Sequence, residues 1–197
     1  MPGVPVPSNP ALADWTARAF DHERKLIRAL VELGQIAGRD VAVVGTIPTW
    51  LRAELHTSGA HILEGSSGEP AAAGGADVAL GAWSFRESLD VGITEALGLL
   101  RPGGRLLIVH DYGRDEIDGL MGDRPESTTW SHRGGPFTEA GFKIHVVHCW
   151  WTFDSIEDAS RFLHDAFGDA GAEFAATLRR PRIAHNLAIY HRDARAA

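Results

Sequence analysis

The chain has 197 residues, of which 44% are hydrophobic and 23% are charged. These fractions are ordinary for a globular protein, and a chain of this length buries enough surface to fold without disulfides or structural metals. The formal net charge of −7 at pH 7 argues against broad electrostatic attraction to nucleic acid or anionic lipid. We therefore expect neither nucleic acid nor a membrane among the partners of this protein.

The cellular compartment is indicated by the N-terminus and by the cysteine content. The first ten residues, MPGVPVPSNP, have neither the basic nor the apolar region of a signal peptide. No apolar run approaches the ~20 residues that a membrane-spanning helix needs. A single cysteine, Cys149, excludes an intramolecular disulfide and is typical of a reducing compartment. The sequence thus predicts a cytoplasmic protein in which Cys149 packs in the core.

The N-terminal third begins with a proline-rich segment. Residues 1–10 predict a flexible tail, and residues 11–197 predict a single domain. Residues 11–33 have a helical pattern, with a break near Asp21 left open, and Gly34 fits as the C-terminal stop. We therefore expect a helix ahead of the first strand.

The first predicted strand is a continuous apolar run. Residues 41–44 (VAVV) end at a glycine, a pattern typical of a strand buried on both faces. Residues 48–56 predict a helix with Thr46 as its cap, and residues 61–63 (HIL) predict a second short strand that is ended by Glu64. Two strands joined by a helix predict the start of a parallel sheet.

The next segment is short. Residues 65–77 number only 13, whereas one βαβ unit takes ~30 residues. A third strand with its helices is therefore shortened or lost. Residues 78–82 predict a strand, residues 87–100 a helix, and residues 101–104 (RPGG) a tight turn into the clearest strand of the chain, at 105–109.

The C-terminal third predicts two more strands around a helix. A polar segment, residues 110–135, carries turn signals, and residues 143–151 alternate enough to form a strand. Residues 155–178 predict a helix with an interruption near 168–171, and residues 182–191 predict the closing strand. This alternation of strands and helices predicts an α/β sheet with helices on both faces.

Three segments together resemble the class I S-adenosylmethionine (SAM)-dependent methyltransferases. Residues 95–108 (EALGLLRPGGRLLI) resemble the helix, turn and fifth strand of that family, and residues 76–80 (ADVAL) look like its fourth strand. The strand, helix and strand over residues 143–191 are similar to its closing elements. The resemblance implies a Rossmann-like, mostly parallel sheet with an antiparallel last strand, and SAM as the cofactor.

The resemblance also implies where SAM would lie. The family has an acidic residue and a G-x-G-x-G loop after its first strand, and Gly45 matches the first of these glycines. Val43 stands at the acidic position, and Ile47 and Thr49 stand at the later glycines. Glu64 matches the carboxylate that binds the ribose hydroxyls. The cofactor-binding residues that we expect follow the ends of the strands: Gly45, Thr46, Glu64, Gly65 and Trp83.

Candidate catalytic residues directly follow the clearest strand. His110 or Asp111 is a candidate general base for the methyl acceptor, and Tyr112 lies beside them. Methyl transfer can also proceed by proximity and orientation alone. A simple turn that ends at Gly113 is the alternative interpretation of these three residues.

Several classes of function remain to be weighed. The leading hypothesis is a methyltransferase-like enzyme that acts on a small molecule, and a homodimer is compatible with it. The alternative, favoured by Val43, Ile47 and Pro48, is a protein of the same fold that has lost SAM binding and acts as a regulatory or assembly partner. A nicotinamide-dependent oxidoreductase ranks last because G-x-G-x-x-G is missing.

No metal site is expected. The closest histidines, His145 and His148, are three apart on a predicted strand and so face opposite ways. The spacings of common zinc sites are missing, as is the G-x-S-x-G elbow of α/β-hydrolases.

Overall fold

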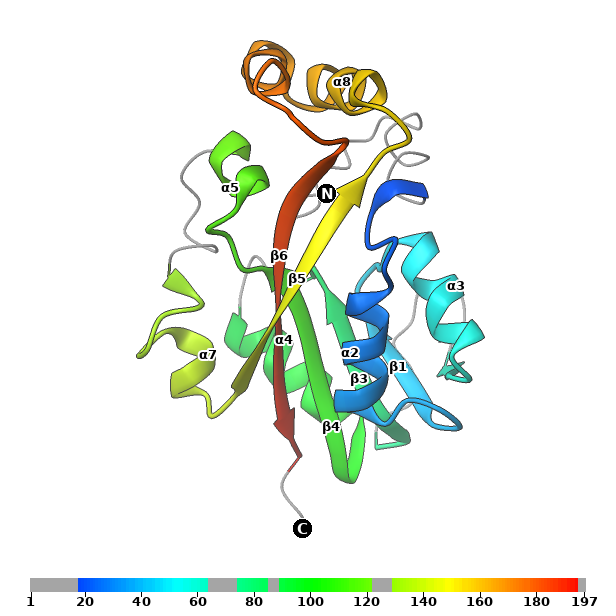
Figure 1. Cartoon of the computed structure of the whole chain (residues 1–197). Helices are drawn as coiled ribbons and strands as arrows, with labels where there is room; N and C mark the ends of the chain where they lie inside the picture. Colours follow the sequence, from blue (N-terminus) through cyan, green and yellow to red (C-terminus); the bar gives the residue numbers. More distant parts are fainter. Residues whose placement is uncertain (1–17, 64–73, 85–88, 122–128, 195–197) are drawn as a thin grey trace.

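One sheet with helices on both faces organises the chain (Figure 1). The computed structural model describes residues 18–63, 74–84, 89–121 and 129–194, so the predicted tail 1–10, Glu64 and Gly65 lie outside the described residues. The strands are β1 (Asp40–Val44), β2 (His61–Leu63), β3 (Ala76–Ala82), β4 (Leu100–Asp111), β5 (Lys143–Thr152) and β6 (Arg182–Asp193). The helices are α2 (Lys25–Gly34), α3 (Thr49–Thr57), α4 (Leu89–Gly98), α5 (Glu116–Met121), α7 (Pro136–Glu139) and α8 (Ile156–Ala175).

The sheet has the strand order β2-β1-β3-β4-β6-β5. Strands β2, β1, β3 and β4 run parallel to one another, whereas β6 runs antiparallel to both of its neighbours, β4 and β5. The prediction of a mostly parallel sheet with an antiparallel last strand is confirmed. Within the described residues the sheet ends at β2, as the short segment after residue 64 predicts.

Each face of the sheet carries its own hydrophobic core. The first core joins α2, α3 and α8 to one face, through residues such as Leu30, Leu51 and Phe162. The second joins α4 and α7 to the other face, through Ala96 and Phe137. Every residue of β3 is buried, because this strand lies in the middle of the sheet with both faces covered.

Helix α2 begins later than the predicted helix over residues 11–33 and ends one residue after it, at Gly34. The break near Asp21 is confirmed, since α2 begins at Lys25, and the Asp21 carboxylate accepts hydrogen bonds from the Lys25 and Leu26 amides at 2.7 and 2.8 Å. At the other end, Gly34 is still helical, and Gln35 takes the left-handed conformation with φ 49°. A Cβ at Gly34 would lie 2.9 Å from the Leu107 side chain, so this glycine permits close packing of α2 on β4.

Two other local predictions are corrected. Thr46 does not cap α3, because the N-cap residue is Pro48 and no side chain caps that end. The 101–104 segment is not a simple turn, because β4 already begins at Leu100. Its pairing with β3 shifts between Ala76–Leu100 and Val78–Arg105, so the extra residues form an irregularity inside the ladder.

The predicted interruption in the last helix is confirmed. Gly168 has non-helical angles (φ 60°, ψ −135°) inside α8. Figure 1 shows α8 beyond the ends of β5 and β6, near α5. The turn that follows α8 therefore leads into β6 at the same end of the sheet at which β4 finishes.

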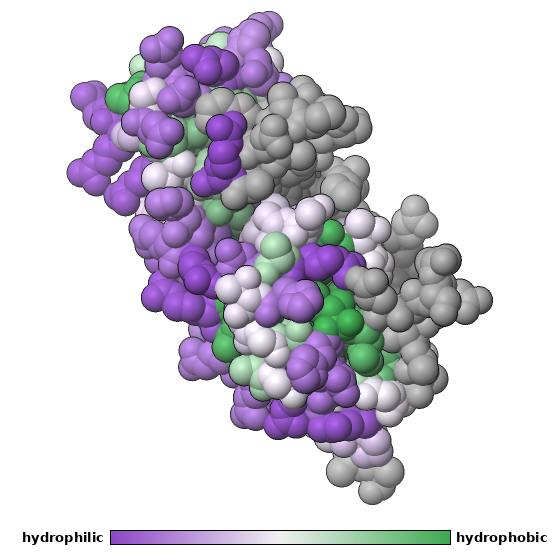
Figure 2. All heavy atoms as spheres, turned by 90° about the vertical axis from the view of Figure 1, so that its right-hand side faces the viewer, coloured by the Kyte–Doolittle hydropathy of each residue, from purple (hydrophilic) through white to green (hydrophobic). Residues whose placement is uncertain are grey.

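The surface on the α3 side is mostly hydrophilic, with hydrophobic side chains exposed near its middle (Figure 2). On the edge strand β2, Ile62 and Leu63 are only half-buried. None of the helices in the described ranges combines the length and the apolar character needed to cross a membrane.

Candidate functional site

The parallel strands end together at one edge of the sheet. Their last residues are Val44, Leu63, Ala82 and Asp111. Ligands of open α/β sheets bind beyond this carboxyl edge, and all of the predicted site residues belong to it or follow it. Glu64 and Gly65, which come directly after β2, lie outside the described residues and stay predictions.

The loop after β1 begins with an exposed glycine. Gly45 has φ +71°, in the left-handed region that favours glycine. A Cβ at this position would lie 3.0 Å from Cβ and 3.1 Å from Oγ of Ser84, which follows β3. The loops after β1 and β3 therefore touch at Gly45, and a larger residue there would push them apart.

The bulky side chain of this loop, that of Ile47, points into the protein. Ile47 is only 5% exposed and belongs to the first hydrophobic core, whereas Thr46 and Thr49 are exposed. The next turn begins α3, where Pro48 provides no side-chain cap for the first amides. Free amides at a helix N-terminus favour negatively charged or polar ligand groups. The exposed residues of the loop are thus Gly45, Thr46 and Thr49.

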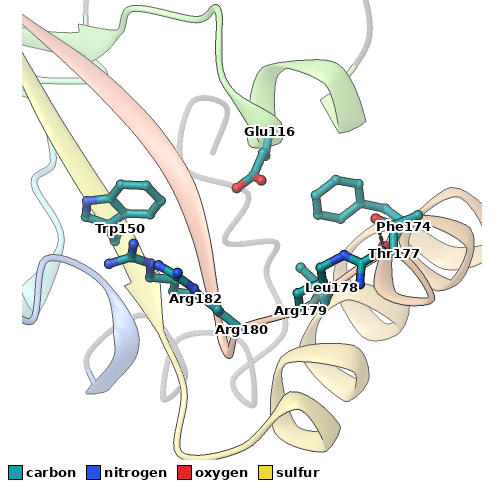
Figure 3. Close-up of a pocket in the computed structure, with 8 residues that line it drawn as sticks. All are labelled: Glu116, Trp150, Phe174, Thr177, Leu178, Arg179, Arg180 and Arg182. Carbon is teal, nitrogen blue, oxygen red and sulfur yellow. Dashed lines mark hydrogen bonds between the residues drawn. The ribbon is translucent and has the colours of Figure 1, made fainter.

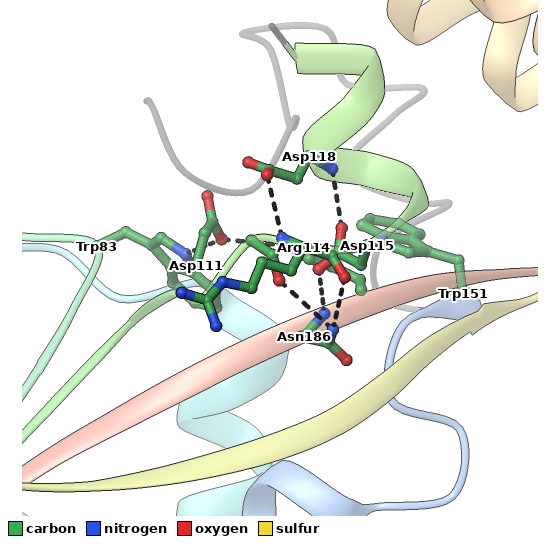
Figure 4. Close-up of polar contacts among 9 residues, drawn as sticks. Trp83, Asp111, Arg114, Asp115, Asp118, Trp151 and Asn186 are labelled. Carbon is green, nitrogen blue, oxygen red and sulfur yellow. Dashed lines mark hydrogen bonds and ion pairs between the residues drawn. The ribbon is translucent and has the colours of Figure 1, made fainter. Parts of the chain in front are cut away.

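Trp83, a predicted cofactor-binding residue, lies mostly inside the protein. Its backbone has φ +55°, its side chain is 9% exposed, and it packs in the first hydrophobic core. The indole Nε1–H donates a hydrogen bond of 2.9 Å to Oδ1 of Asp111 (Figure 4). The indole N–H of Trp83 is therefore already hydrogen-bonded to Asp111.

Asp111 belongs to a buried chain of four side chains. Besides Trp83, its Oδ1 lies 3.2 Å from Nε2 of His185, and Trp151 Nε1–H donates to His185 Nδ1 at 3.1 Å. An indole nitrogen only donates, so Nδ1 of His185 accepts and its Nε2–H donates to Asp111. Asp111 and His185 are 2% and 1% exposed. We call this chain, Trp83–Asp111–His185–Trp151, the buried polar chain.

The ring of Phe20 covers the buried polar chain. Its centroid lies 5.0 Å from that of Trp151 and 5.4 Å from that of His185. The next residue, Asp21, donates its backbone N–H to the carbonyl of Trp150 at 3.1 Å, so the N-terminal segment is fixed across β5.

Cys149 is buried, as predicted. Burial, together with the neighbouring Asp21, raises the pKa of its thiol above the ordinary value.

The turn after β4 is tied to β6 by a second set of contacts. Asp115 accepts a hydrogen bond of 2.6 Å from the Asn186 amide and another of 2.8 Å from the Asp118 amide (Figure 4). Burial raises the pKa of Asp115, while the backbone amides of Asn186 and Asp118 act in the opposite direction. The start of α5 is thereby held against β6.

The structure does not bring the three predicted catalytic side chains together. His110 is 1% exposed, and its ring meets Trp130 edge-on at 4.5 Å between centroids, in the second core. Asp111 points to the opposite face, because neighbouring strand residues alternate. Tyr112 is half-buried, with its hydroxyl 3.4 Å from the Arg114 guanidinium. Only Tyr112 of the three has appreciable contact with solvent.

Two solved structures share this arrangement. A protein from Anaeromyxobacter dehalogenans, provisionally assigned as a type II methyltransferase, has a TM-score of 0.53 and 16% identity, over 86% of this chain and 97% of that one. A Haloferax volcanii protein, provisionally assigned as a methyltransferase and solved with the Trm112 methyltransferase activator, has a TM-score of 0.51 and 17% identity, over 95% and 94%. This chain has the class I methyltransferase fold. No protein-family model matches the sequence, and no curated protein matches it significantly.

The loop after β1 fits the cofactor that this methyltransferase fold implies. SAM requires close approach of the loop backbone, and Gly45 is exposed and left-handed there. Ile47, at the position of the family's second glycine, points into the core and so does not obstruct the outer face. The family's acidic position is filled by Val43, which is half-buried. Thr49, at the position of the third glycine, is exposed on the loop. The described residues thus present the backbone of Gly45 to a SAM-like ligand but omit one of the usual polar contacts and keep a branched side chain at the third position.

Sequence reasoning missed His185 and Trp151 in this methyltransferase fold. Both lie on strands that were predicted, but their partner Asp111 is 74 residues from His185 along the chain. The antiparallel register pairs Asp111 with Leu187, two residues from His185 on the same face of β6. The register of β5 against β6 brings Trp151 to the same place, opposite Ile183. Within the described ranges, no three metal-ligating side chains converge.

Proposed function

We propose that this protein is a SAM-dependent methyltransferase that acts on a small molecule. The observation that carries the proposal is the loop after β1, where Gly45 is exposed at φ +71° and Ile47 is turned into the core. This combination gives a ligand access to the backbone at the carboxyl edge of the sheet, where the methyltransferase fold binds its cofactor. The fold of the two similar structures supports the same assignment.

Bound SAM would supply an activated methyl group. Gly45 and Thr46 would hold it through their backbone, and Glu64 would accept hydrogen bonds from the ribose hydroxyls. Because Asp111 and His110 are buried, neither is placed to take a proton from an acceptor. The proposal is therefore catalysis by proximity and orientation, which can account for a large share of a reaction barrier.

Binding of the cofactor is the first test. A ligand that binds only the native state raises stability by RT ln(1 + [L]/Kd), about 2.7 kcal/mol at 100 Kd. We expect SAM and S-adenosylhomocysteine to raise the Tm, and NAD to leave it unchanged. No shift at millimolar SAM would contradict the proposal.

Gly45→Ala tests the loop itself. The Cβ would be strained at this φ and would press on Ser84, so we expect SAM affinity to fall roughly tenfold or more. Gly119→Ala is the matched control, because a Cβ at Gly119 meets nothing within 4 Å. Equal SAM affinity in the two variants would remove the loop from the site.

Glu64→Gln tests the contact to the ribose. We expect weaker binding of SAM, with Glu32→Gln, an exposed change on α2, as the control. If Glu64→Gln binds SAM as the unmodified protein does, Glu64 has no part in the site, although the loop proposal stands.

The second candidate function is a regulatory or assembly partner that keeps the fold without SAM. Val43 at the acidic position and the burial of His110 and Asp111 favour it. The Haloferax volcanii structure is a complex with an activator protein, so a chain of this fold can assemble with a partner. The same titration separates the two candidates, because this one predicts no response to SAM.

A further inference from the structure

A pocket lies where α8 turns into β6, away from the loop after β1. Its volume is about 320 Å³, within the range of small-molecule sites. Figure 3 shows its walls, which come from α5, β5, the end of α8 and the start of β6. Its lining includes Glu116, Trp150, Phe174, Arg179, Arg180 and Arg182.

One wall of the pocket is strongly basic. Arg179, Arg180 and Arg182 lie within four consecutive positions of a chain whose net charge is −7. Across the part of the chain that the structure describes, none of these three guanidinium groups forms an ion pair or hydrogen bond through its side chain. One exposed carboxylate, Glu23, interacts electrostatically with Arg182, which helps to lower the pKa of Glu23. The three arginines still outnumber it, and an excess of positive charge in a concave site raises the local concentration of anions. The wall is thus suited to a negatively charged ligand.

Arg182 is held in place by an aromatic ring. Its guanidinium carbon lies 4.4 Å from the centroid of the Trp150 ring, and Figure 3 shows the two groups side by side at the pocket. A guanidinium stacked on a ring keeps its in-plane N–H groups available for other partners. These donors match a carboxylate or a phosphate, which arginine binds in a two-pronged manner.

The wall opposite the arginines has a carboxylate, that of Glu116, which already accepts a hydrogen bond. Glu116 Oε2 accepts a hydrogen bond of 2.6 Å from the Ala184 amide. Its negative charge disfavours an anion on that side, so a bound anion would sit against the arginines. Between the two walls, Trp150, Phe174 and Leu178 offer apolar surface. The pocket therefore has an anion-binding end and an apolar middle.

We propose that this pocket binds a small amphiphilic anion, with a carboxylate or phosphate at the arginines and an aromatic or aliphatic body against Trp150 and Phe174. The site is separate from the loop around Gly45, so the proposal holds whether or not the protein binds SAM.

Calorimetric titration at low ionic strength tests the proposal. The probes are phenyl phosphate, phenylacetate, inorganic phosphate and benzyl alcohol. We expect one of the two aromatic anions to bind more tightly than inorganic phosphate, and benzyl alcohol not to bind. The stronger of the two identifies the anionic group, and added salt should weaken its binding.

Variants locate the binding. Arg182→Gln should weaken the aromatic anion roughly tenfold, the loss expected for one charge-assisted pair of hydrogen bonds. Arg161→Gln is the control, because Arg161 lies on α8 outside the lining of this pocket and is paired with Asp158 at 3.4 Å. Arg182→Lys keeps the charge without the planar donors and should fall between the two. Unfolding curves of each variant show whether it is folded.

Three results would overturn the proposal. The first is no binding of either aromatic anion by the folded protein. The second is an equal affinity of Arg182→Gln and Arg161→Gln. The third is binding of a single-stranded oligonucleotide without binding of phenyl phosphate or phenylacetate, which would assign the arginines to nucleic acid.

Discussion

Asp77 and Asp111 are buried aspartates at opposite edges of the same sheet, and they are held by different partners. Asp77, at the amino edge, contacts the guanidinium groups of Arg39 and Arg101 and accepts a hydrogen bond of 3.0 Å from the Asp40 amide. Asp111, at the carboxyl edge, is held by an indole and an imidazole.

The two aspartates differ in whether water can replace the carboxylate when it is removed. Arg39 and Arg101 are 42% and 46% exposed, so water can solvate them if Asp77 is removed. The partners of Asp111 are deep in the core, where water cannot replace a lost acceptor. An unsatisfied buried donor costs more than a solvated one. The comparison therefore predicts that the carboxyl edge is the more sensitive of the two to substitution.

The largest effect is expected from Asp111→Ala. The change leaves the Trp83 and His185 donors without an acceptor and opens a cavity, so the free energy of unfolding should fall by about 3 kcal/mol. For a chain of this size that corresponds to about 6–12 °C in Tm. Asp111→Asn keeps a carbonyl acceptor and should lose less than half as much. A loss below about 1 kcal/mol in Asp111→Ala would mean that the buried polar chain is not stabilising.

Asp77→Asn should have a smaller effect, about 2 kcal/mol, and one that depends on pH. Burial opposes ionisation, but the Asp40 amide, Arg101 and Arg39 together hold the pKa of Asp77 below its ordinary value. A lowered pKa contributes stability above the unfolded value of about 3.9, and this contribution is lost as the pH falls through the folded pKa.

Urea unfolding at several pH values measures this contribution. The difference between the unmodified protein and Asp77→Asn should be constant from about pH 7 to pH 5 and should shrink below about pH 4. A difference that does not change with pH would show that Asp77 acts through its shape and not through its charge.

Trp83→Phe should cost about 1 kcal/mol, because it removes one donor to Asp111 and keeps an aromatic ring. Trp50→Phe is the matched control. The Trp50 Nε1 is buried and makes no hydrogen bond with the described residues, so its removal sacrifices no such bond. Thermal unfolding should place Trp83→Phe below Trp50→Phe in stability. The reverse order would contradict the assigned role of the Trp83 indole.

The strands and the buried polar chain differ in how well the sequence predicts them. The parallel strands follow from apolar runs such as 41–44 and 78–82, and the truncated third-strand region follows from the spacing of residues 65–77. These are local signals, and the structure confirms the strands. The pairing of Asp111 with His185 depends on strand register over 74 residues, which no local pattern encodes.

Two left-handed backbone conformations could not be predicted from the sequence for a related reason. Gln35 and Trp83 adopt left-handed conformations, although neither residue type favours them. Tertiary packing imposes both, since Gly34 is needed for contact with Leu107 and the Trp83 indole must reach Asp111. The loop after β1 shows the same limit, because the inward orientation of Ile47 cannot be inferred from its place in the motif.

The smallest effect is expected at the exposed amino edge, from Asp193→Ala. Nε of Arg105 lies 2.6 Å from Asp193 Oδ1, but the aspartate side chain is 65% exposed. Exposed ion pairs contribute about 0–1 kcal/mol and are screened by salt, and Arg105 also donates to the Leu33 carbonyl. We expect a change of at most about 0.5 kcal/mol that disappears in about 1 M salt. A larger, salt-resistant loss would place a stability-determining charge at the amino edge and would break the contrast with Asp111.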